Sequence, residues 1–258
     1  MAHTLGDRSR RLTDAAALLT PKGRRAAERF LFEGETLLRE ARDAELPAHE
    51  IFATQRAYDR TPLLREMEQD GTPLWIVSDK AARRLSDVET PSGIVAVASR
   101  RFDSVAGILA RPGTVLVLAD LSDPGNAGTL LRSAEAFGAA GAVFGAAGVD
   151  PYHPKVVRAA MGSLFRLPVA IADPARLAEE AKTAERAVAG ITAEGGRGIE
   201  EVPGGAVLVV GQERRGLGAW QAACELSFAI PMRRHTESLN AAVAGSIALF
   251  QASLRRPE

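Results

Sequence analysis

The chain has 258 residues, of which 46% are hydrophobic and 25% charged, and its 32 basic residues are balanced by 32 acidic ones. This length accommodates one large domain or two ordinary ones, with enough apolar residues for well-packed cores. A zero net charge argues against a protein that coats nucleic acid everywhere, because phosphate binding requires concentrated positive charge. The longest apolar runs, at 207–210 and 241–250, are far short of a membrane span, and we expect a cytoplasmic protein with no membrane partner.

Cysteine and histidine usage predicts neither a disulfide nor a metal site. Cys224 is the only cysteine, and its place in an apolar-spaced helical stretch favours a buried, inert thiol. The four histidines, His3, His49, His153 and His235, are scattered and lack the paired spacing of a zinc or iron site. We therefore expect no metal.

Basic residues crowd the first thirty positions, where only Asp7, Asp14 and Glu28 are acidic. A charge run of this kind is typical of a solvated terminal face. It is also a source of sequence-independent phosphate contacts if the ligand is a nucleic acid. The arginines concerned are Arg8, Arg10, Arg11, Arg24, Arg25 and Arg29.

The first hundred residues predict a small α/β domain. Its expected elements are helices within 9–44 joined by a turn at 20–23, short apolar strands at 30–32, 50–53, 74–77 and 93–98, and a helix at 62–69. The segment 100–113 ends in Arg111-Pro112-Gly113 and is the predicted linker, because proline and glycine punctuate it. We place the boundary near residue 105, which gives domains 1–105 and 106–258.

From residue 114 onward, apolar strands alternate with helices. The predicted strands are 115–119, 142–144, 169–172, 187–192, 207–210 and 227–230, and the predicted helices are 127–137, 154–161, 174–185, 217–223 and 239–254. Strands separated by helices of this length imply a mostly parallel sheet with helices on both faces. Ligands of such sheets bind at the carboxyl ends of the strands.

Three polar turns follow predicted strands. They are residues 123–128, with Arg132 on the following helix, residues 211–217, and the segment from Ile230-Pro231-Met232 to Asn240. All three fall at strand carboxyl ends, which predicts loops around one ligand. Gly-x-Gly-x-x-Gly and Walker-type loops are missing from the sequence, which argues against a standard nicotinamide or ATP enzyme.

Each turn taken alone has an ordinary structural interpretation. Gly211 and Gly216 allow a ligand such as an adenosyl group to approach the main chain, but a tight turn also needs glycine. Asn126 and Arg132 suit contact with a phosphate or a developing alkoxide, or simply a helix cap and a surface arginine. Residues 238–240 are open to the same alternative of a helix cap.

The three constellations together resemble a known family. Asn126-x-Gly128-x-x-x-Arg132, then Gly211-x-Glu213-x-x-Gly216-Leu217, then Ile230-Pro231-Met232 with Ser238-Leu239-Asn240 resemble the signature motifs of the SpoU (TrmH-type) RNA 2′-O-ribose methyltransferases of the SPOUT superfamily. Residues 157–163 resemble the family's segment between the first two motifs. Residues 29–34 and 91–97 resemble the small RNA-binding domain often fused in front, so the resemblance spans nearly the entire chain.

The resemblance implies an α/β fold with a trefoil knot near its C-terminal end, S-adenosylmethionine as cofactor, and a homodimer with active sites close to the subunit interface. It places catalytic groups at Arg132, Asn126, Glu213, Ser238 and Asn240. It places cofactor contacts at the backbone around Val209, Gly211, Ile230, Met232 and Leu239. A guanidinium titrates far above neutral pH, so for Arg132 we favour phosphate anchoring and alkoxide stabilisation over general-base catalysis.

The expected reaction is methylation of a ribose 2′-hydroxyl in RNA, with 23S ribosomal RNA preferred and the six arginines above as phosphate contacts. Alternatives are a tRNA methyltransferase, a non-catalytic RNA-binding ribosome-assembly factor that retains the knot, and a methyltransferase for a small molecule or protein. Three positions at two places depart from the family pattern, because Arg214 and the pair Arg234-His235 stand where glycine is common. Both departures add positive charge or bulk near the expected RNA face.

Overall fold

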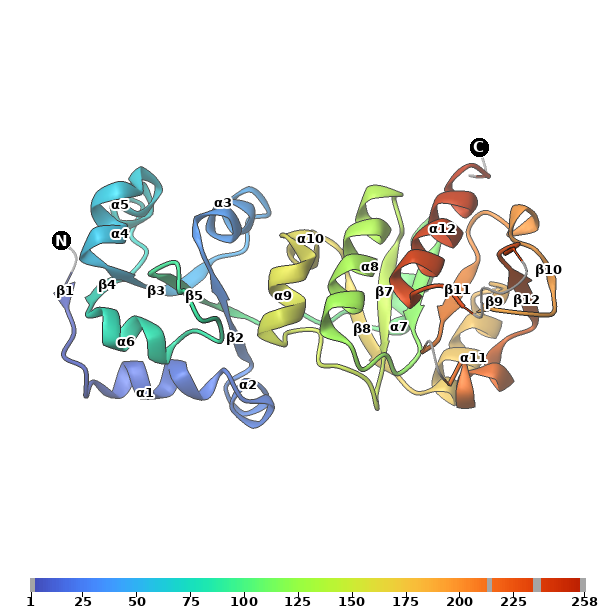
Figure 1. The fold of residues 1–258 in the computed structure, drawn as a ribbon, viewed down its shortest axis with the longest axis horizontal. Helices are drawn as coiled ribbons and strands as arrows, with labels where there is room; N and C mark the ends of the chain where they lie inside the picture. Colours follow the sequence, from blue (N-terminus) through green and yellow to red (C-terminus); the bar gives the residue numbers. More distant parts are fainter. Residues whose placement is uncertain (1–2, 213–214, 234–237, 256–258) are drawn as a thin grey trace. The chain divides into compact units, whose positions relative to one another are not determined.

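The computed structural model of the protein describes residues 3–212, 215–233 and 238–255. It divides into two compact units, shown in Figure 1. The first unit contains the residues up to Arg100 together with Tyr152–Phe165, and the second contains Arg101–Pro151 and the residues from Arg166 onward. None of the described helices is long and apolar enough to cross a membrane.

The first unit is built on a five-stranded sheet in the order β1-β4-β3-β5-β2. Its strands are β1 (His3–Thr4), β2 (Arg29–Glu33), β3 (Ala48–Thr54), β4 (Leu74–Val77) and β5 (Ile94–Ser99). The strands β1, β4 and β3 are parallel, whereas β5 runs antiparallel to both β3 and β2. The sheet is therefore mixed, as expected for a small α/β domain.

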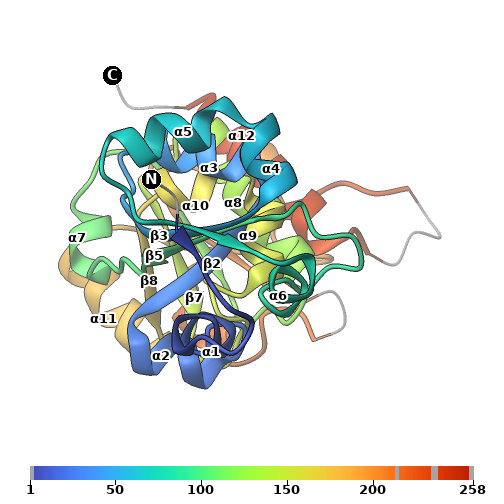
Figure 2. The same cartoon turned by 90° about the vertical axis from the view of Figure 1, so that its left-hand side faces the viewer.

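Helices cover both faces of this sheet (Figure 2). One face carries α3 (Glu35–Asp43), α4 (Gln55–Arg60) and α5 (Pro62–Gln69), and the other carries α1 (Arg10–Ala17) and α6 (Asp79–Arg84). The remaining helices of the unit are α2 (Pro21–Ala27), α9 (Pro154–Ala160) and α10 (Ser163–Arg166).

Aromatic rings join the segment 152–165 to the first unit. The ring centroids of Phe30 and Tyr152 are 4.6 Å apart, and those of Phe32 and Phe165 are 5.3 Å apart. Phe30 and Phe32 belong to β2 and are buried. In the sequence, this segment lies between β7 (Gly141–Gly145) and β8 (Val169–Ala172), two strands of the second unit.

The second unit holds a seven-stranded sheet in the order β10-β12-β9-β11-β6-β7-β8. Its strands are β6 (Val115–Leu118), β7 (Gly141–Gly145), β8 (Val169–Ala172), β9 (Val188–Thr192), β10 (Arg197–Gly198), β11 (Val207–Val210) and β12 (Leu226–Ala229). Every paired strand in it is parallel. The predicted parallel sheet is confirmed.

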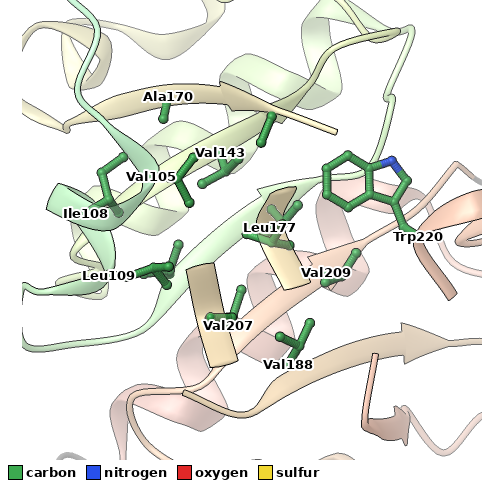
Figure 3. Packing of buried hydrophobic residues seen from close by; sticks show 14 of the residues in the cluster. Val105, Ile108, Leu109, Val143, Ala170, Leu177, Val188, Val207, Val209 and Trp220 are labelled. Atoms are coloured by element: carbon green, nitrogen blue, oxygen red, sulfur yellow. The ribbon is translucent and has the colours of Figure 1, made fainter. Parts of the chain in front are cut away.

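Helices cover both faces of the second sheet. On one face, α7 (Val105–Leu109), α11 (Pro174–Thr183) and the 3-10 helix η2 (Gly218–Ala223) pack in a buried cluster with Val143, Val207 and Val209 (Figure 3). On the other face, α8 (Pro124–Ala136) packs against α12 (Ala241–Ser253), which also contacts β11. The short 3-10 helix η1 (Ile199–Glu201) follows β10.

The predicted linker contains a helix of the second core, so the linker prediction is wrong over α7. Val105, Ile108 and Leu109 are at most 3% exposed and belong to the buried cluster of Figure 3. The side chain of Ser104 caps the helix by accepting from the amide of Gly107. Apolar residues at helical spacing outweigh the punctuation by Pro112 and Gly113 that follows them.

Candidate functional site

A pocket of about 230 Å³ lies at the carboxyl ends of three adjacent parallel strands, β12, β9 and β11. Ligands of parallel α/β sheets bind at this edge. Residues from the ends of these strands, from the loop after β11 and from the start of α12 form its walls. They are Ile191, Thr192, Ala193, Val210, Gly211, Gln212, Gly216, Leu217, Gln221, Ile230, Met232, Ser238, Leu239, Ala241 and Ala244.

The loop after β11 is closed by its own main chain. The amide of Gln212 donates to the carbonyl of Gly216 at 3.0 Å, and the amide of Gly216 donates to the carbonyl of Gln212 at 2.8 Å. A Cβ atom on Gly211 would lie 2.1 Å from the Gly216 carbonyl oxygen. Glycine is needed at 211 for this close approach, and at 216 for a φ of +57°.

The structure brings Asn126 and Asn240 together across 114 positions of sequence. The Nδ2 of Asn240 donates to Oδ1 of Asn126 at 2.9 Å. The Oδ1 of Asn240 also caps α12 by accepting from the amides of Ala242 and Val243. Asn240 therefore combines the capping role with a contact between the first and third motifs.

Asn126 is not the cap of its own helix. The N-cap of α8 is Asp123, whose Oδ1 accepts from the Asn126 amide at 2.7 Å. The side chain of Asn126 is therefore available for the contact with Asn240, and the simple capping interpretation of Asn126 is wrong.

The other predicted catalytic residues are placed differently. Ser238 lines the pocket. Arg132 is exposed on α8 and is not among the lining residues. Glu213 lies outside the described residues, as do the three positions that depart from the family pattern, Arg214, Arg234 and His235.

Most of the predicted cofactor contacts gather at the pocket, since Gly211, Ile230, Met232 and Leu239 all line it. Val209 instead belongs to the buried cluster and is fully buried. Its neighbour Val210 lines the pocket, because successive side chains of a strand point to opposite faces.

Sequence reasoning missed the third wall of the pocket, formed by Ile191, Thr192 and Ala193 at the end of β9. This strand precedes β11 and β12 in the chain but lies between them in the sheet. The sequence did offer one sign of this wall, because β9 ends in the polar residue Thr192. Strand order, which makes it a neighbour of the other two, is not visible in the sequence.

The prediction that Arg24 contacts RNA phosphate is wrong. Arg24 is fully buried, and its Nη1 donates to the carbonyls of Leu18 and Leu19, each at 3.0 Å. A guanidinium used in this way fixes the turn between α1 and α2 and is not available to a ligand.

The other arginines of the basic segment are exposed, namely Arg8, Arg10, Arg11, Arg25 and Arg29. Arg10 lies 3.7 Å from Asp14, and Arg11 lies 3.4 Å from Glu50 and stacks over the Trp75 ring at 4.6 Å. Exposed ion pairs of this kind are weak and leave the guanidinium groups accessible to phosphate.

Burial makes Cys224 a poor nucleophile. Desolvation raises the pKa of its thiol from 9.0 to about 11, so the group stays protonated at neutral pH. Its sulfur donates to the Trp220 carbonyl at 3.3 Å. The expected inert thiol agrees with this environment. Among the described residues, no cluster of three or more His, Cys, Asp or Glu side chains could hold a metal ion.

The sequence model of the SpoU rRNA Methylase family matches residues 113–250, which include the pocket and the three motifs. The chain belongs to this family. A second match, to the MRM3-like substrate binding domain, covers residues 10–96. The resemblance inferred from the three motifs is confirmed, and the pocket at the edge of the parallel sheet lies within the SpoU match.

Three relatives of this SpoU family member match it over almost their whole length. The 23S rRNA (guanosine(2553)-2′-O)-methyltransferase RlmP of Bacillus subtilis is 30% identical over 246 residues, which are 94% of this chain and 96% of RlmP. The SpoU methyltransferase AviRb of Streptomyces viridochromogenes, solved with AdoMet, has a TM-score of 0.85 at 28% identity, covering 96% of this chain and 98% of AviRb. An AdoMet-bound rRNA methyltransferase from Sinorhizobium meliloti has a TM-score of 0.85 at 26% identity, with 97% of each chain covered.

Proposed function

We propose that the protein transfers a methyl group from S-adenosylmethionine to a ribose 2′-hydroxyl of 23S ribosomal RNA. The observation that carries this proposal is the pocket at the carboxyl ends of β12, β9 and β11, inside the region matched by the SpoU family. The names of the relatives add support, since RlmP methylates a 23S rRNA ribose and AviRb was solved with AdoMet.

The residues of the pocket suit an adenosyl cofactor. Apolar side chains such as Ile230, Met232 and Leu239 offer walls for a flat base, and the glycine loop exposes main-chain groups for hydrogen bonds. Thr192 and Gln221 add polar side chains to the same lining. When bound, the cofactor supplies an electrophilic methyl group on a sulfonium.

The reaction breaks the sulfur–methyl bond and forms an oxygen–methyl bond. S-adenosylhomocysteine leaves with the sulfur electron pair, and the proton of the ribose hydroxyl passes to solvent water. An activated donor needs chiefly an aligned acceptor, so the protein's main task is positioning. We assign acceptor positioning to Asn126, Asn240, Ser238 and Glu213. Arg132 would anchor a phosphate of the RNA and stabilise the forming alkoxide, because its guanidinium stays charged.

We propose residues 1–105 as the RNA-binding part and residues 106–258 as the catalytic part of the chain. Support comes from the match to a substrate binding domain over residues 10–96 and from the exposed arginines Arg8, Arg10, Arg11, Arg25 and Arg29. Changing Arg25 and Arg29 to Gln should lower the slope of log affinity against log salt by about one for each lost phosphate contact. Arg176→Gln, an exposed arginine of α11, is the matched control. Equal slopes in all three proteins would contradict this assignment.

We also propose a homodimer that uses α12. This helix is mostly apolar, and Val243 and Phe250 on it and Leu254 at its C-cap are 48%, 47% and 64% exposed. A mostly apolar helix is normally buried, so a second copy of the chain is the expected cover. Phe250→Glu should convert the dimer to a monomer in analytical ultracentrifugation. An unchanged mass would exclude α12 from the interface.

The test of the function is transfer of labelled methyl from S-adenosylmethionine to unmodified ribosomal and transfer RNA, followed by alkaline hydrolysis. Alkali-resistant label at one 23S nucleotide establishes 2′-O-methylation. Arg132→Lys keeps the charge but loses the fork geometry, and it should lower turnover about a hundredfold while cofactor affinity is retained. Label in transfer RNA alone would name the other substrate, and cofactor binding without transfer to any RNA would favour the non-catalytic binding factor.

A further inference from the structure

Asp120 lies two residues after the end of β6 and has a φ of +51°, a left-handed conformation that is uncommon for residues other than glycine. Such a conformation costs free energy and persists only where the surrounding contacts hold it. Neither the three motifs nor the pocket lining includes this residue. Its contacts nevertheless lead to the pocket.

The three oxygen atoms of Asp120 accept hydrogen bonds from three separate segments. Its Oδ2 accepts from the indole Nε1 of Trp220 at 2.8 Å, and its Oδ1 accepts from the amide of Ala147 at 3.2 Å. Its carbonyl accepts from Nε2 of Gln212 at 2.6 Å. One residue thereby joins the end of β6 to the loop after β7, the loop after β11 and the helix η2.

The neighbouring chain is shaped for this carboxylate. A Cβ atom on Gly145 would lie 2.2 Å from Oδ1 of Asp120, and one on Gly148 would lie 3.0 Å from its Cα. The first distance is too short for any real side chain and the second is tighter than most Cβ contacts, so the end of β7 and the loop after it approach Asp120 closely.

Two of these contacts lead to the pocket wall, one through Gln212 and one through Trp220. Gln212 is itself a lining residue at the start of the glycine loop. Trp220 lies between the lining residues Leu217 and Gln221, is 1% exposed, and donates its amide to the Leu217 carbonyl at 3.0 Å. Its ring belongs to the buried cluster of Figure 3. Fixing the indole therefore also helps to fix Leu217 and Gln221 in the pocket wall.

We propose that Asp120 is a positioning residue that holds both sides of the loop between Gln212 and Gln221 in the arrangement that binds the cofactor. This inference rests on the proposed function. An ionised carboxylate is an acceptor at both oxygens and satisfies the indole and the Ala147 amide together. An Asn side chain has one acceptor and one donor group, so one of the two N–H groups would face another donor.

Two substitutions at Asp120 separate the carboxylate from the backbone conformation. Asp120→Asn keeps the shape but loses one acceptor, whereas Asp120→Gly relieves the left-handed strain and loses both. If Asp120 served only the turn, the Gly variant would be neutral or more stable. Glu185→Gly is the matched control, because Glu185 is also acidic, has a φ of +53° in the same unit, and is exposed.

The experiment measures S-adenosylmethionine affinity by calorimetry on the full chain. We expect both Asp120 variants to bind S-adenosylmethionine about tenfold to hundredfold more weakly, which is the range that loss of a hydrogen bond to a charged group corresponds to. Glu185→Gly should bind it like the wild type. Trp220→Phe should give a similar loss, and adding it to Asp120→Asn should give less than the product of the two effects.

A second readout needs no cofactor. In a Trp75→Phe background, Trp220 is the only tryptophan, and exchange of its indole proton with solvent can be followed by NMR. The exchange should accelerate at least tenfold in both Asp120 variants. Wild-type affinity retained by both folded variants would overturn the positioning role alone. Failure of the unmodified protein to bind S-adenosylmethionine would instead overturn the proposed function, and the positioning role with it.

Discussion

At each edge of the seven-stranded sheet, where the strands begin and where they end, one charged residue joins several segments of the chain by hydrogen bonds. At the amino edge, Arg186 donates to the carbonyls of Gly205, Leu109 and Arg111 at 2.9–3.1 Å and also contacts the Gly113 carbonyl. At the carboxyl edge, Asp120 accepts from three segments. The arginine ties loops to one another, whereas the aspartate ties loops around a pocket.

The comparison shows that hydrogen bonding by one charged residue can stabilise the fold at one edge and shape a binding pocket at the other. Burial lowers the pKa of Arg186, and its carbonyl partners compensate the lost hydration. This arrangement stabilises the fold, and all the hydrogen-bond acceptors named for Arg186 are main-chain carbonyls of the protein itself. At the carboxyl edge, the strands β9, β11 and β12 end at a cavity that the glycine turn after β11 helps to line. Changes at the amino edge should therefore affect stability, and changes at the carboxyl edge should affect cofactor binding.

The largest effect is expected for Arg186→Met. Loss of the guanidinium leaves several partly buried carbonyls without donors and should lower the free energy of unfolding by about 3 kcal/mol. Denaturant titration measures this loss. Arg176→Met, which removes an exposed arginine paired with Glu180, should cost under about 0.5 kcal/mol. Cofactor affinity in folded Arg186→Met should stay within about twofold of wild type, because Arg186 lies at the edge opposite the pocket. A tenfold change in affinity would correspond to about 1.4 kcal/mol. A tenfold loss would erase the distinction between the edges.

Gly211→Ala probes the carboxyl edge by steric conflict. Its Cβ would meet the Gly216 carbonyl at 2.1 Å, so the bridge between Gln212 and Gly216 should open. We expect at least a tenfold loss of cofactor affinity, equivalent to about 1.4 kcal/mol. The comparison variant is Gly205→Ala at the amino edge, where a φ of +77° makes alanine unfavourable. Calorimetry should show weaker binding only for the first variant, and equal losses would contradict the assignment.

A smaller effect on stability is expected at Asn240, where the helix cap and the contact with Asn126 can be tested separately. Asn240→Ala removes the cap of α12 and the contact with Asn126, and should cost about 1 kcal/mol of stability. Asn240→Asp keeps the cap acceptor but lacks the Nδ2 donor, so it should unfold like wild type and still lose methyl transfer. Thermal unfolding and single-turnover transfer separate the two roles. Full turnover in Asn240→Asp would remove the contact with Asn126 from the mechanism.

The smallest effect at neutral pH concerns Cys224, because its contribution changes only in alkaline solution. The folded thiol has a pKa of about 11 against an ordinary value of 9.0, so the thiolate is favoured in the unfolded chain. Its contribution to stability is complete below pH 9.0 and is lost as the pH rises through about 11. Denaturant titrations across this range should show a smaller fall in Cys224→Ala than in wild type. Identical slopes would mean that the thiol is not desolvated.

Sequence patterns predicted strands well where four apolar residues stand between turn residues. The strands at 74–77, 169–172 and 207–210 have the predicted bounds. The helices α4 and α6 were missed because each has only six residues, too few to display helical periodicity. The missed helix α7 is shorter still and lay beside a proline and glycine pair.

The site was only partly predictable for a physical reason. Gly211, Ile230 and Leu239 belong to local motifs, and they line the pocket. Thr192 and Asp120 reach the same region through strand order and through side-chain contacts across about a hundred positions, which no local pattern encodes. Burial of Arg24 was equally invisible, since its charge alone predicted exposure.

The most direct test of the difference between the two edges is a crystal structure of the protein with S-adenosylmethionine. We expect the cofactor at the carboxyl ends of β9, β11 and β12, against Gly211, Ile230 and Leu239, with the indole of Trp220 still donating to Asp120. Cofactor bound anywhere else on the protein, or a pocket from which it is absent at saturating concentration, would contradict the assignment of this edge as the methyl-donor site.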